Sequence, residues 1–150
     1  MLGQDYFYGR IGQSSDYAQA MKWYRSAADK GLALAMRDIA YLYKAGKGVS
    51  VDYAEAVRWY RMAADRGDAS SMNSLGYRYD QGTGVTRDYA EAMRWYQKAA
   101  ALGNAAAMYN IGMLYKNGQG VSSSLTEAKK WFQLSADGGD EDAKEQLKKL

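Results

Sequence analysis

The sequence contains no histidine, no cysteine and no proline among its 150 residues. Without histidine and cysteine there is no Ser-His-Asp triad, no cysteine nucleophile and none of the usual nitrogen or sulfur ligands of zinc. Disulfides are excluded too, so cysteine usage does not indicate a redox compartment. The lack of proline permits helices without proving them. We therefore expect no metal and no cofactor.

Long hydrophobic runs are also missing. The longest aliphatic stretch lies near residues 32–36, which is too short to span a bilayer, and residues 1–12 do not resemble a secretory signal. The net charge is only +3, from 20 basic and 17 acidic residues, while 47% of the residues are apolar. This balance predicts a soluble globular chain with neither a membrane nor a nucleic acid as its partner.

Tyrosine and tryptophan are abundant instead, with 14 and 4 residues, and the tryptophans reveal an internal repeat. Trp23, Trp59, Trp95 and Trp131 follow one another at intervals of 36 residues. Two columns of glycine keep the same step: Gly31, Gly67, Gly103 and Gly139, and then Gly48, Gly84 and Gly120. Three columns in one register do not arise by chance, so the chain is built from repeats of 36 residues.

Each period predicts two helices. Residues 69–82 carry apolar side chains at spacings of three and four, which form one stripe of a helix, and residues 88–103 do the same. Gly76 and Gly112 lie inside the first helix of their repeats, where a glycine costs about 1 kcal/mol. Their presence predicts that a neighbouring helix approaches closely at these two positions.

The second helix of each repeat has clear boundary signals. Asp52 with Glu55, and Asp88 with Glu91, have the spacing of a capping box. In that motif the first side chain accepts from the backbone N–H three residues on, while the glutamate reaches back to the cap. The glycine column that begins at Gly31 then falls where a left-handed C-terminal cap ends a helix.

These residues carry a family resemblance. The pattern A-x-x-x-L-G-x-x-Y-x-x-G-x-G-V-x-x-D-Y-A-E-A-x-x-W-Y-x-x-A-A-x-x-G resembles the Sel1-like repeat, a relative of the tetratricopeptide repeat with a longer interhelical loop. It covers essentially the whole chain and departs at Leu125, Phe132 and Ala40. Many members carry a cysteine pair in each repeat, and this chain has none. The resemblance implies an all-α, right-handed solenoid of stacked antiparallel helix pairs.

We expect one solenoid over residues 1–150. It would comprise a part-repeat at 1–32, full repeats at 33–68, 69–104 and 105–140, and a solvating C-terminal capping helix at 141–150. Stacking is needed because one helix pair cannot bury its apolar faces alone. The tryptophan column is therefore expected in the core rather than in an aromatic binding site. Because the chain starts in mid-repeat, we predict an excised or redesigned array with a frayed or partner-covered N-terminal end.

Three local patterns have structural interpretations. The loops at residues 46–48 and 82–84 lack the glycine spacing of phosphate or dinucleotide sites and follow helices. Residues 137–142 do not match a calcium loop, whereas acidic residues suit the start of a helix. A basic column that includes Arg58 and Arg94 is balanced by acidic or amide residues three positions earlier, which argues against nucleic-acid binding.

Tyrosine is the informative residue, because the repeat motif explains ten of the 14 and leaves Tyr8, Tyr41, Tyr77 and Tyr109. One row of each first helix points away from its partner helix, and by resemblance to tetratricopeptide repeats this row lines the concave surface. This first-helix row comprises Leu34, Arg37, Tyr41 and Lys44, then Ser70, Asn73, Tyr77 and Asp80, then Ala106, Tyr109, Met113 and Lys116. Aromatics with Arg and Met are typical of protein-binding patches. Alternatively, Tyr41 and Tyr77 only pack on each other between adjacent repeats.

The sequence thus predicts a non-enzymatic scaffold that binds a partner protein or peptide. The candidate binding residues are Arg37, Tyr41, Lys44, Asn73, Tyr77, Asp80, Tyr109, Met113 and Lys116. One alternative follows from relatives linked to penicillin binding and β-lactamase activity, although the chain has no Ser-x-x-Lys; another is a ligand-free engineered or excised scaffold. We expect a monomer or a weak homodimer through the truncated N-terminal repeat. The compartment stays open, and the resemblance allows a bacterial periplasmic or secreted parent protein.

Overall fold

The computed structural model describes residues 16–150, and every regular element in that range is an α-helix. The helices are α2 (Tyr17–Asp29), α3 (Ala33–Ala45), α4 (Tyr53–Asp65), α5 (Ala69–Gln81), α6 (Tyr89–Ala101), α7 (Ala105–Asn117), α8 (Leu125–Asp137) and α9 (Glu141–Lys149). The predicted helices at 69–82 and 88–103 correspond to α5 and α6, and both are confirmed to within two residues at each end. Helices α3, α5 and α7 are the first helices of the full repeats.

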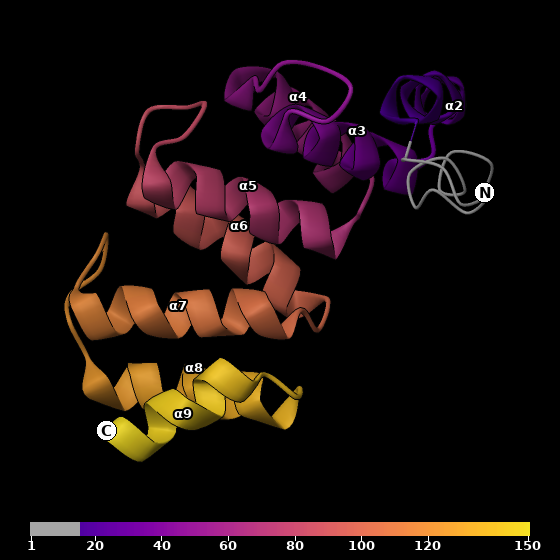
Figure 1. Cartoon of the computed structure of the whole chain (residues 1–150). Helices are drawn as coiled ribbons and strands as arrows, with labels where there is room; N and C mark the ends of the chain where they lie inside the picture. Colours follow the sequence, from indigo (N-terminus) through magenta and orange to yellow (C-terminus); the bar gives the residue numbers. More distant parts are fainter. Residues whose placement is uncertain (1–15) are drawn as a thin grey trace. The chain divides into compact units, whose positions relative to one another are not determined.

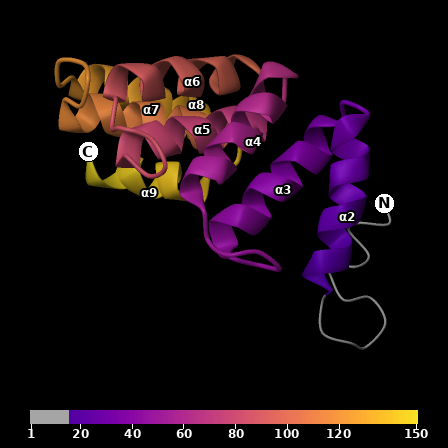
Figure 2. The same cartoon turned by 90° about the horizontal axis from the view of Figure 1, so that it is seen from above.

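The chain forms two compact units, the first ending at Asp68 and the second running from Ala69 to Leu150. In the first unit α3 packs against both α2 and α4, and in the second each helix from α5 to α9 packs against the next (Figures 1 and 2). The interpretation of residues 1–150 as a single solenoid remains a prediction. Tyr8 and the predicted frayed or partner-covered N-terminal end lie outside the described residues, and the dimer contact through the part-repeat at 1–32 remains a prediction.

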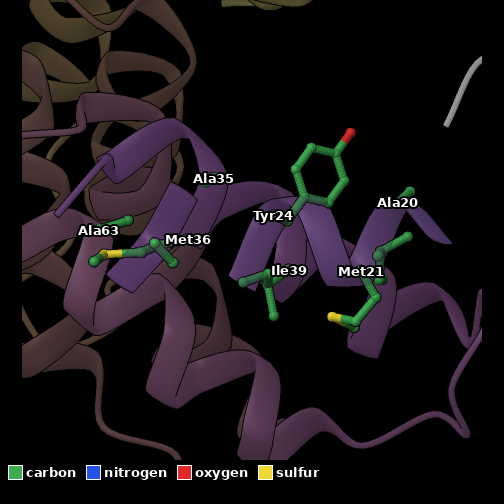
Figure 3. Close-up of a cluster of buried hydrophobic side chains, with 9 residues drawn as sticks. Ala20, Met21, Tyr24, Ala35, Met36, Ile39 and Ala63 are labelled. Carbon is green, nitrogen blue, oxygen red and sulfur yellow. The ribbon is translucent and has the colours of Figure 1, made fainter. Parts of the chain in front are cut away.

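Small side chains bring the helices of the first unit together. Its core contains Ala20, Met21, Tyr24 and Ala28 of α2, Ala35, Met36, Ile39 and Leu42 of α3, and Ala63 of α4 (Figure 3). Alanine recurs at the contacts because its methyl group lets two helix backbones approach, and the longer methionine side chains fill the remaining space. The three helices therefore share one apolar interior.

Gly76 and Gly112 allow the close helix contacts that their positions predict. A methyl group added to Gly76 would lie 2.7 Å from two ring carbons of Tyr96, and one added to Gly112 would lie 2.7 Å from two ring carbons of Phe132. Both rings are fully buried. The glycines thus make room for an aromatic ring of the second helix in the same repeat, and this prediction is confirmed.

The helix caps follow the sequence signals in most respects. Oδ1 of Asp52 accepts from the backbone N–H of Glu55 at 2.9 Å, and Asp88 does the same for Glu91 at 3.0 Å. At the other end, Gly31 has a φ of 83° as a left-handed C-terminal cap requires. The second hydrogen bond of the predicted capping box, from the backbone N–H of Asp52 to the side chain of Glu55, is wrong. That N–H donates to the carbonyl of Tyr43 at 3.0 Å instead.

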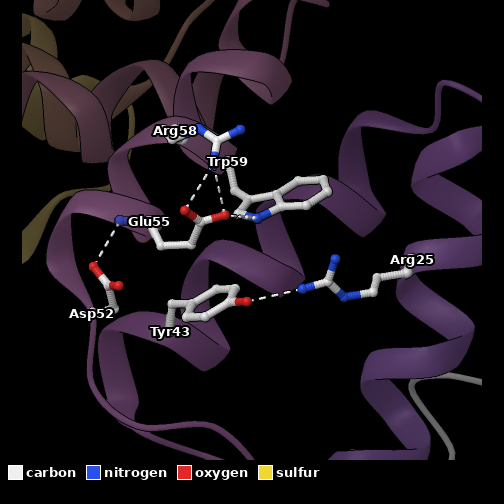
Figure 4. A network of polar contacts seen from close by, with 6 residues as sticks. All are labelled: Arg25, Tyr43, Asp52, Glu55, Arg58 and Trp59. Atoms are coloured by element: carbon white, nitrogen blue, oxygen red, sulfur yellow. Dashed lines mark hydrogen bonds and ion pairs between the residues drawn. The ribbon is translucent and has the colours of Figure 1, made fainter.

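The glutamates, which do not bond back to the cap, instead accept hydrogen bonds from the tryptophans of their own helices. The carboxylate of Glu55 accepts from Nε1 of Trp59 at 3.2 Å and from the guanidinium of Arg58 at 2.9 Å (Figure 4). Glu91 binds Trp95 and Arg94 in the same way, at 3.1 Å and 3.2 Å. Each carboxylate therefore ties an indole to a solvent-exposed arginine.

The prediction of a buried tryptophan column is therefore wrong for most of its members. Trp95 is only 6% exposed, but Trp23 is 39% exposed, and Trp59 and Trp131 are half-buried. Trp95 makes the same hydrogen bond to a glutamate as Trp59, so the side chains around each indole, and not this bond, set how deeply it is buried. The fully buried aromatic positions are those of Tyr96 and Phe132.

The predicted C-terminal cap is present as α9. Asp140 begins it, with Oδ1 accepting from the N–H of Ala143 at 2.8 Å, so the acidic stretch does mark a helix start. Ala143 is buried against Ala128 and Phe132, and Leu147 and Leu150 pack against the same cluster. The charged residues of α9 face outward, which gives the second unit a polar end.

Candidate partner-binding surface

Every position of the first-helix row within the described chain lies on α3, α5 or α7, but the three helices place it in different surroundings. The start of the α3 row is tied to its own unit. Nη1 of Arg37 contacts Oδ1 of Asp68 at 3.3 Å, and the side chain of Asp68 is only 11% exposed. Burial raises the pKa of the neighbouring Asp38 carboxyl, with the charge of Arg37 opposing that shift. Arg37 therefore serves an intramolecular ion pair that a partner would have to compete with.

The end of the α3 row gathers cations around one aromatic ring. The ammonium of Lys44 lies 5.0 Å from the ring centre of Tyr41, and that of Lys47 lies 5.3 Å from it. Lys47 also donates to the Tyr41 hydroxyl at 3.3 Å and lies 5.3 Å from the ring centre of Tyr17. We call these four residues, Tyr17, Tyr41, Lys44 and Lys47, the Tyr41 cluster.

On α5 the row presents one exposed ring beside one engaged carboxylate. Tyr77 is 44% exposed, and the guanidinium of Arg78 lies 5.2 Å from its ring centre. One turn further on, Oδ2 of Asp80 accepts from the hydroxyl of Tyr96 at 3.1 Å. Burial raises the pKa of Asp80 while this hydrogen bond lowers it, and burial raises the pKa of the Tyr96 hydroxyl. Tyr77 is thus the most accessible aromatic of the row.

Asn73, the other candidate on α5, bridges neighbouring repeats. Its Oδ1 accepts from Nδ2 of Asn110 on α7 at 2.9 Å. Since both amides are half-buried, this hydrogen bond fixes the spacing of α5 and α7 in the second unit. Asn73 therefore has a structural partner within the described chain.

On α7 the row faces the C-terminal end of the chain. The ring of Tyr109 lies 5.6 Å from that of Phe132 at a tilt of 45°, and Met113 packs against the same cluster as α9. Nζ of Lys116 donates to Oε1 of Gln146 on α9 at 2.7 Å. Packing within the second unit thus accounts for the contacts of all three candidates on this helix.

The row as read from the sequence missed Lys47 and Tyr17. The loops of the first and third full repeats each approach the start of the second helix in the preceding repeat: a methyl group on Gly48 would lie 2.7 Å from Cβ of Tyr17, and one on Gly120 would lie 2.6 Å from Cβ of Tyr89. This contact brings the middle loop residue onto that tyrosine. The signal was available in the loop sequences GKG, GTG and GQG, which differ only at the middle position.

The described residues offer no arrangement typical of a metalloenzyme. Within residues 16–150 no three His, Cys, Asp or Glu side chains come together in a way that could hold a metal ion. None of the helices in this range is long and apolar enough to cross a membrane. The candidate residues on α3, α5 and α7 carry aromatic rings, ammonium groups and amides, and aromatic side chains are enriched in protein interfaces.

Helix pairs of constant length, repeated in one register, define an all-α solenoid of the tetratricopeptide-like class. The family model described as "Sel1 repeat" matches residues 1–32, 33–68, 69–104 and 105–140. The chain therefore belongs to the Sel1 repeat family, whose members are generally protein-interaction scaffolds without catalytic activity. No curated protein matches the chain.

Solved structures of bacterial proteins share this fold. A Sel1 repeat protein from Oxalobacter formigenes is 38% identical with a TM-score of 0.93, over 99% of this chain and 60% of that one. A protective antigen of uropathogenic Escherichia coli strains, displaying an SLR fold, is 43% identical with a TM-score of 0.91, over 97% of this chain and 31% of that one. This chain thus spans less than two thirds of either relative.

A more distant structure, the cysteine-rich protein B of Helicobacter pylori, shares the fold alone. It is 20% identical with a TM-score of 0.66, over 85% of this chain and 96% of that one. The absence of cysteine from the present chain shows that the helix-pair repeat does not depend on disulfides here. Packing of the buried helix faces is sufficient to define the repeat.

Proposed function

We propose that the chain is a non-enzymatic scaffold that binds a partner protein or peptide through the first-helix row. The observation that carries this proposal is the exposure of Tyr77 on α5, on the side of the helix opposite the buried stripe. Tyrosine contributes a large contact area at a low cost in side-chain entropy, which is why it recurs in protein interfaces. The general role of the Sel1 family in protein binding supports the same function.

The row residues are expected to contribute unequally. Tyr77 is exposed, and Tyr41 and Lys44 are half-buried, so each side chain offers part of its ring or its charge to a partner. Asn73 and Asp80 are hydrogen bonded within the second unit, so they would contribute mainly by fixing the surface around Tyr77. We therefore propose the first three as the contact residues and the other two as positioning residues.

The remaining candidates are expected to matter less. Arg37 is ion-paired with Asp68, and Tyr109, Met113 and Lys116 pack against Phe132 or α9. Side chains that are already ion-paired on a mostly buried carboxylate, or that already fill a cluster, gain little from a partner. Alanine at these positions is therefore expected to lower stability before it lowers affinity.

Partner capture with the purified chain tests the proposal. Wild type and the double variant Tyr41→Ala, Tyr77→Ala are immobilised, exposed to a lysate of the source organism, and the bound proteins are identified by mass spectrometry. Leu134→Ala on α8 is the matched control, because Leu134 is 50% exposed and lies outside the row. The double variant should lose the captured partner while its far-UV circular dichroism stays unchanged. Equal capture by all three proteins would contradict the assignment.

A further inference from the structure

The Tyr41 cluster concentrates positive charge at the end of α3. Both ammonium groups lie about 5 Å from the centre of the Tyr41 ring, so they are no more than about 10 Å apart. Like charges at that distance repel, and the repulsion is only partly screened at physiological ionic strength. Cation–π attraction to the rings of Tyr41 and Tyr17 offsets part of this repulsion.

Lys47 of this cluster is held as a charged group. The hydrogen bond to Tyr41 raises the pKa of Lys47, with burial opposing that shift and Tyr17 adding to it. Lys47 therefore carries a full charge throughout the physiological pH range. Lys44 lies in the last turn of α3, where the helix dipole also favours a cation.

Stacking of the repeats does not account for this pair of lysines. At the positions of Lys44 and Lys47, the second repeat has Asp80 and Thr83 and the third has Lys116 and Gln119. Lys116 donates to Gln146 of α9, and Gln119 still contacts the tyrosine of the preceding repeat, at 3.1 Å from the hydroxyl of Tyr89. The loop contact thus forms without a lysine, so the double positive charge is a property of the first full repeat alone.

We propose that the Tyr41 cluster binds the carboxylates of an acidic peptide segment in a partner protein, with Lys44 and Lys47 as the charged contacts and the Tyr41 ring as the apolar one. This inference rests on the proposed function and specifies its partner. The cluster is too small for a nucleic acid, which would need phosphate contacts along an extended strand. Its neighbours on α3 include Asp38, and Arg37 is ion-paired with Asp68, so the positive charge does not continue along the helix.

Selection from a random twelve-residue peptide library, with the full chain immobilised, tests the proposal. Wild type should enrich peptides rich in Asp and Glu. In the variant Lys44→Asp, Lys47→Thr the cluster takes the residues of the second repeat, and the acidic preference should disappear. The control Lys129→Glu, Lys148→Thr makes the same change in net charge at two exposed positions of α8 and α9. This control should still enrich acidic peptides. Fluorescence anisotropy with the best wild-type peptide should show Kd about tenfold higher for the cluster variant.

The outcomes separate this inference from the proposed function. Selected peptides without acidic enrichment, whose binding is lost in Tyr77→Ala, would overturn the acidic partner while supporting the row as a binding surface. An acidic preference that survives in the cluster variant would also overturn it. Tighter binding of a labelled oligothymidine than of the best peptide to wild type would likewise overturn the acidic peptide as the partner. If no peptide is enriched, the acidic-peptide inference is overturned, while partner capture from a lysate decides the proposed function separately.

Discussion

Replacing Gly112 with alanine should destabilise the second unit, even though alanine is the better helix former. The added methyl group would lie 2.7 Å from two carbons of the Phe132 ring and 3.2 Å from a third, whereas ordinary contacts begin near 3.4 Å. Phe132 is fully buried, so its ring cannot swing into solvent. Helix α7 or the ring therefore has to shift by several tenths of an ångström.

Two opposing effects set the size of this change. Alanine gains about 1 kcal/mol over glycine inside a helix, while overpacking a filled core costs about 1–3 kcal/mol. In the first unit the corresponding pair, Ala40 and Tyr60, is buried, so this interface tolerates a methyl group when the surrounding residues suit it. The difference between the two effects is a net loss of between zero and about 2 kcal/mol, and we expect about 1 kcal/mol for Gly112→Ala.

Urea unfolding followed by far-UV circular dichroism measures this difference. The informative comparison repeats Gly112→Ala in a Phe132→Leu background, where the smaller side chain leaves room for the methyl group. There the substitution should stabilise by up to about 1 kcal/mol, because only the helix propensity remains. A stabilisation of wild type by the same amount, or an equal effect in both backgrounds, would refute the close-contact argument.

Two further predictions concern a missing cap and a buried hydrogen bond. Leu32 occupies the N-cap of α3 without a side-chain bond and is 56% exposed; its backbone (φ −78°, ψ 109°) matches that of the capping Asn104 (φ −73°, ψ 106°). Leu32→Asn should therefore stabilise by about 0.5–1 kcal/mol, seen as a higher Tm, whereas Leu32→Ala should not. Tyr96→Phe removes the hydroxyl that lowers the pKa of Asp80, so the raised pKa rises further. Its cost should be small near pH 4 and grow to about 1 kcal/mol at pH 7 as Asp80 ionises; equal costs at both pH values would contradict this.

The helices and their ends could be predicted because their signals are local. The apolar spacing, the Asp52 and Asp88 caps and the left-handed glycine at position 31 act within one or two turns, so each repeat carries them in its own sequence. The close contacts at Gly76 and Gly112 could also be inferred, because an unexplained helix-breaking residue implies a steric reason. The same reasoning cannot give the depth of burial of a side chain, which depends on what the neighbouring helices place around it.

The tryptophans illustrate that limit. Their regular spacing predicted core positions, yet Trp59 and Trp95 make the same hydrogen bond to a glutamate of their own helix while only Trp95 is buried. The sequence places Glu55 four residues before Trp59, but it also places Glu55 three residues after Asp52, which is the spacing of a capping box. The choice between the two is made by the backbone, where the carbonyl of Tyr43 already accepts the N–H of Asp52.

The first-helix row shows why a period predicts positions but not roles. One position of the repeat holds Tyr41, Tyr77 and Met113, and these side chains meet two lysines, a flanking arginine and the C-terminal cluster, respectively. The differences come from the loop residue 47 and from α9, both of which lie outside the row in sequence. Function in such an array is therefore carried by the departures from the repeat, since the residues that every repeat shares are already needed to stack it. Tyr77, which lies outside the shared repeat motif, and the Tyr41 cluster are the places at which we propose that binding concentrates.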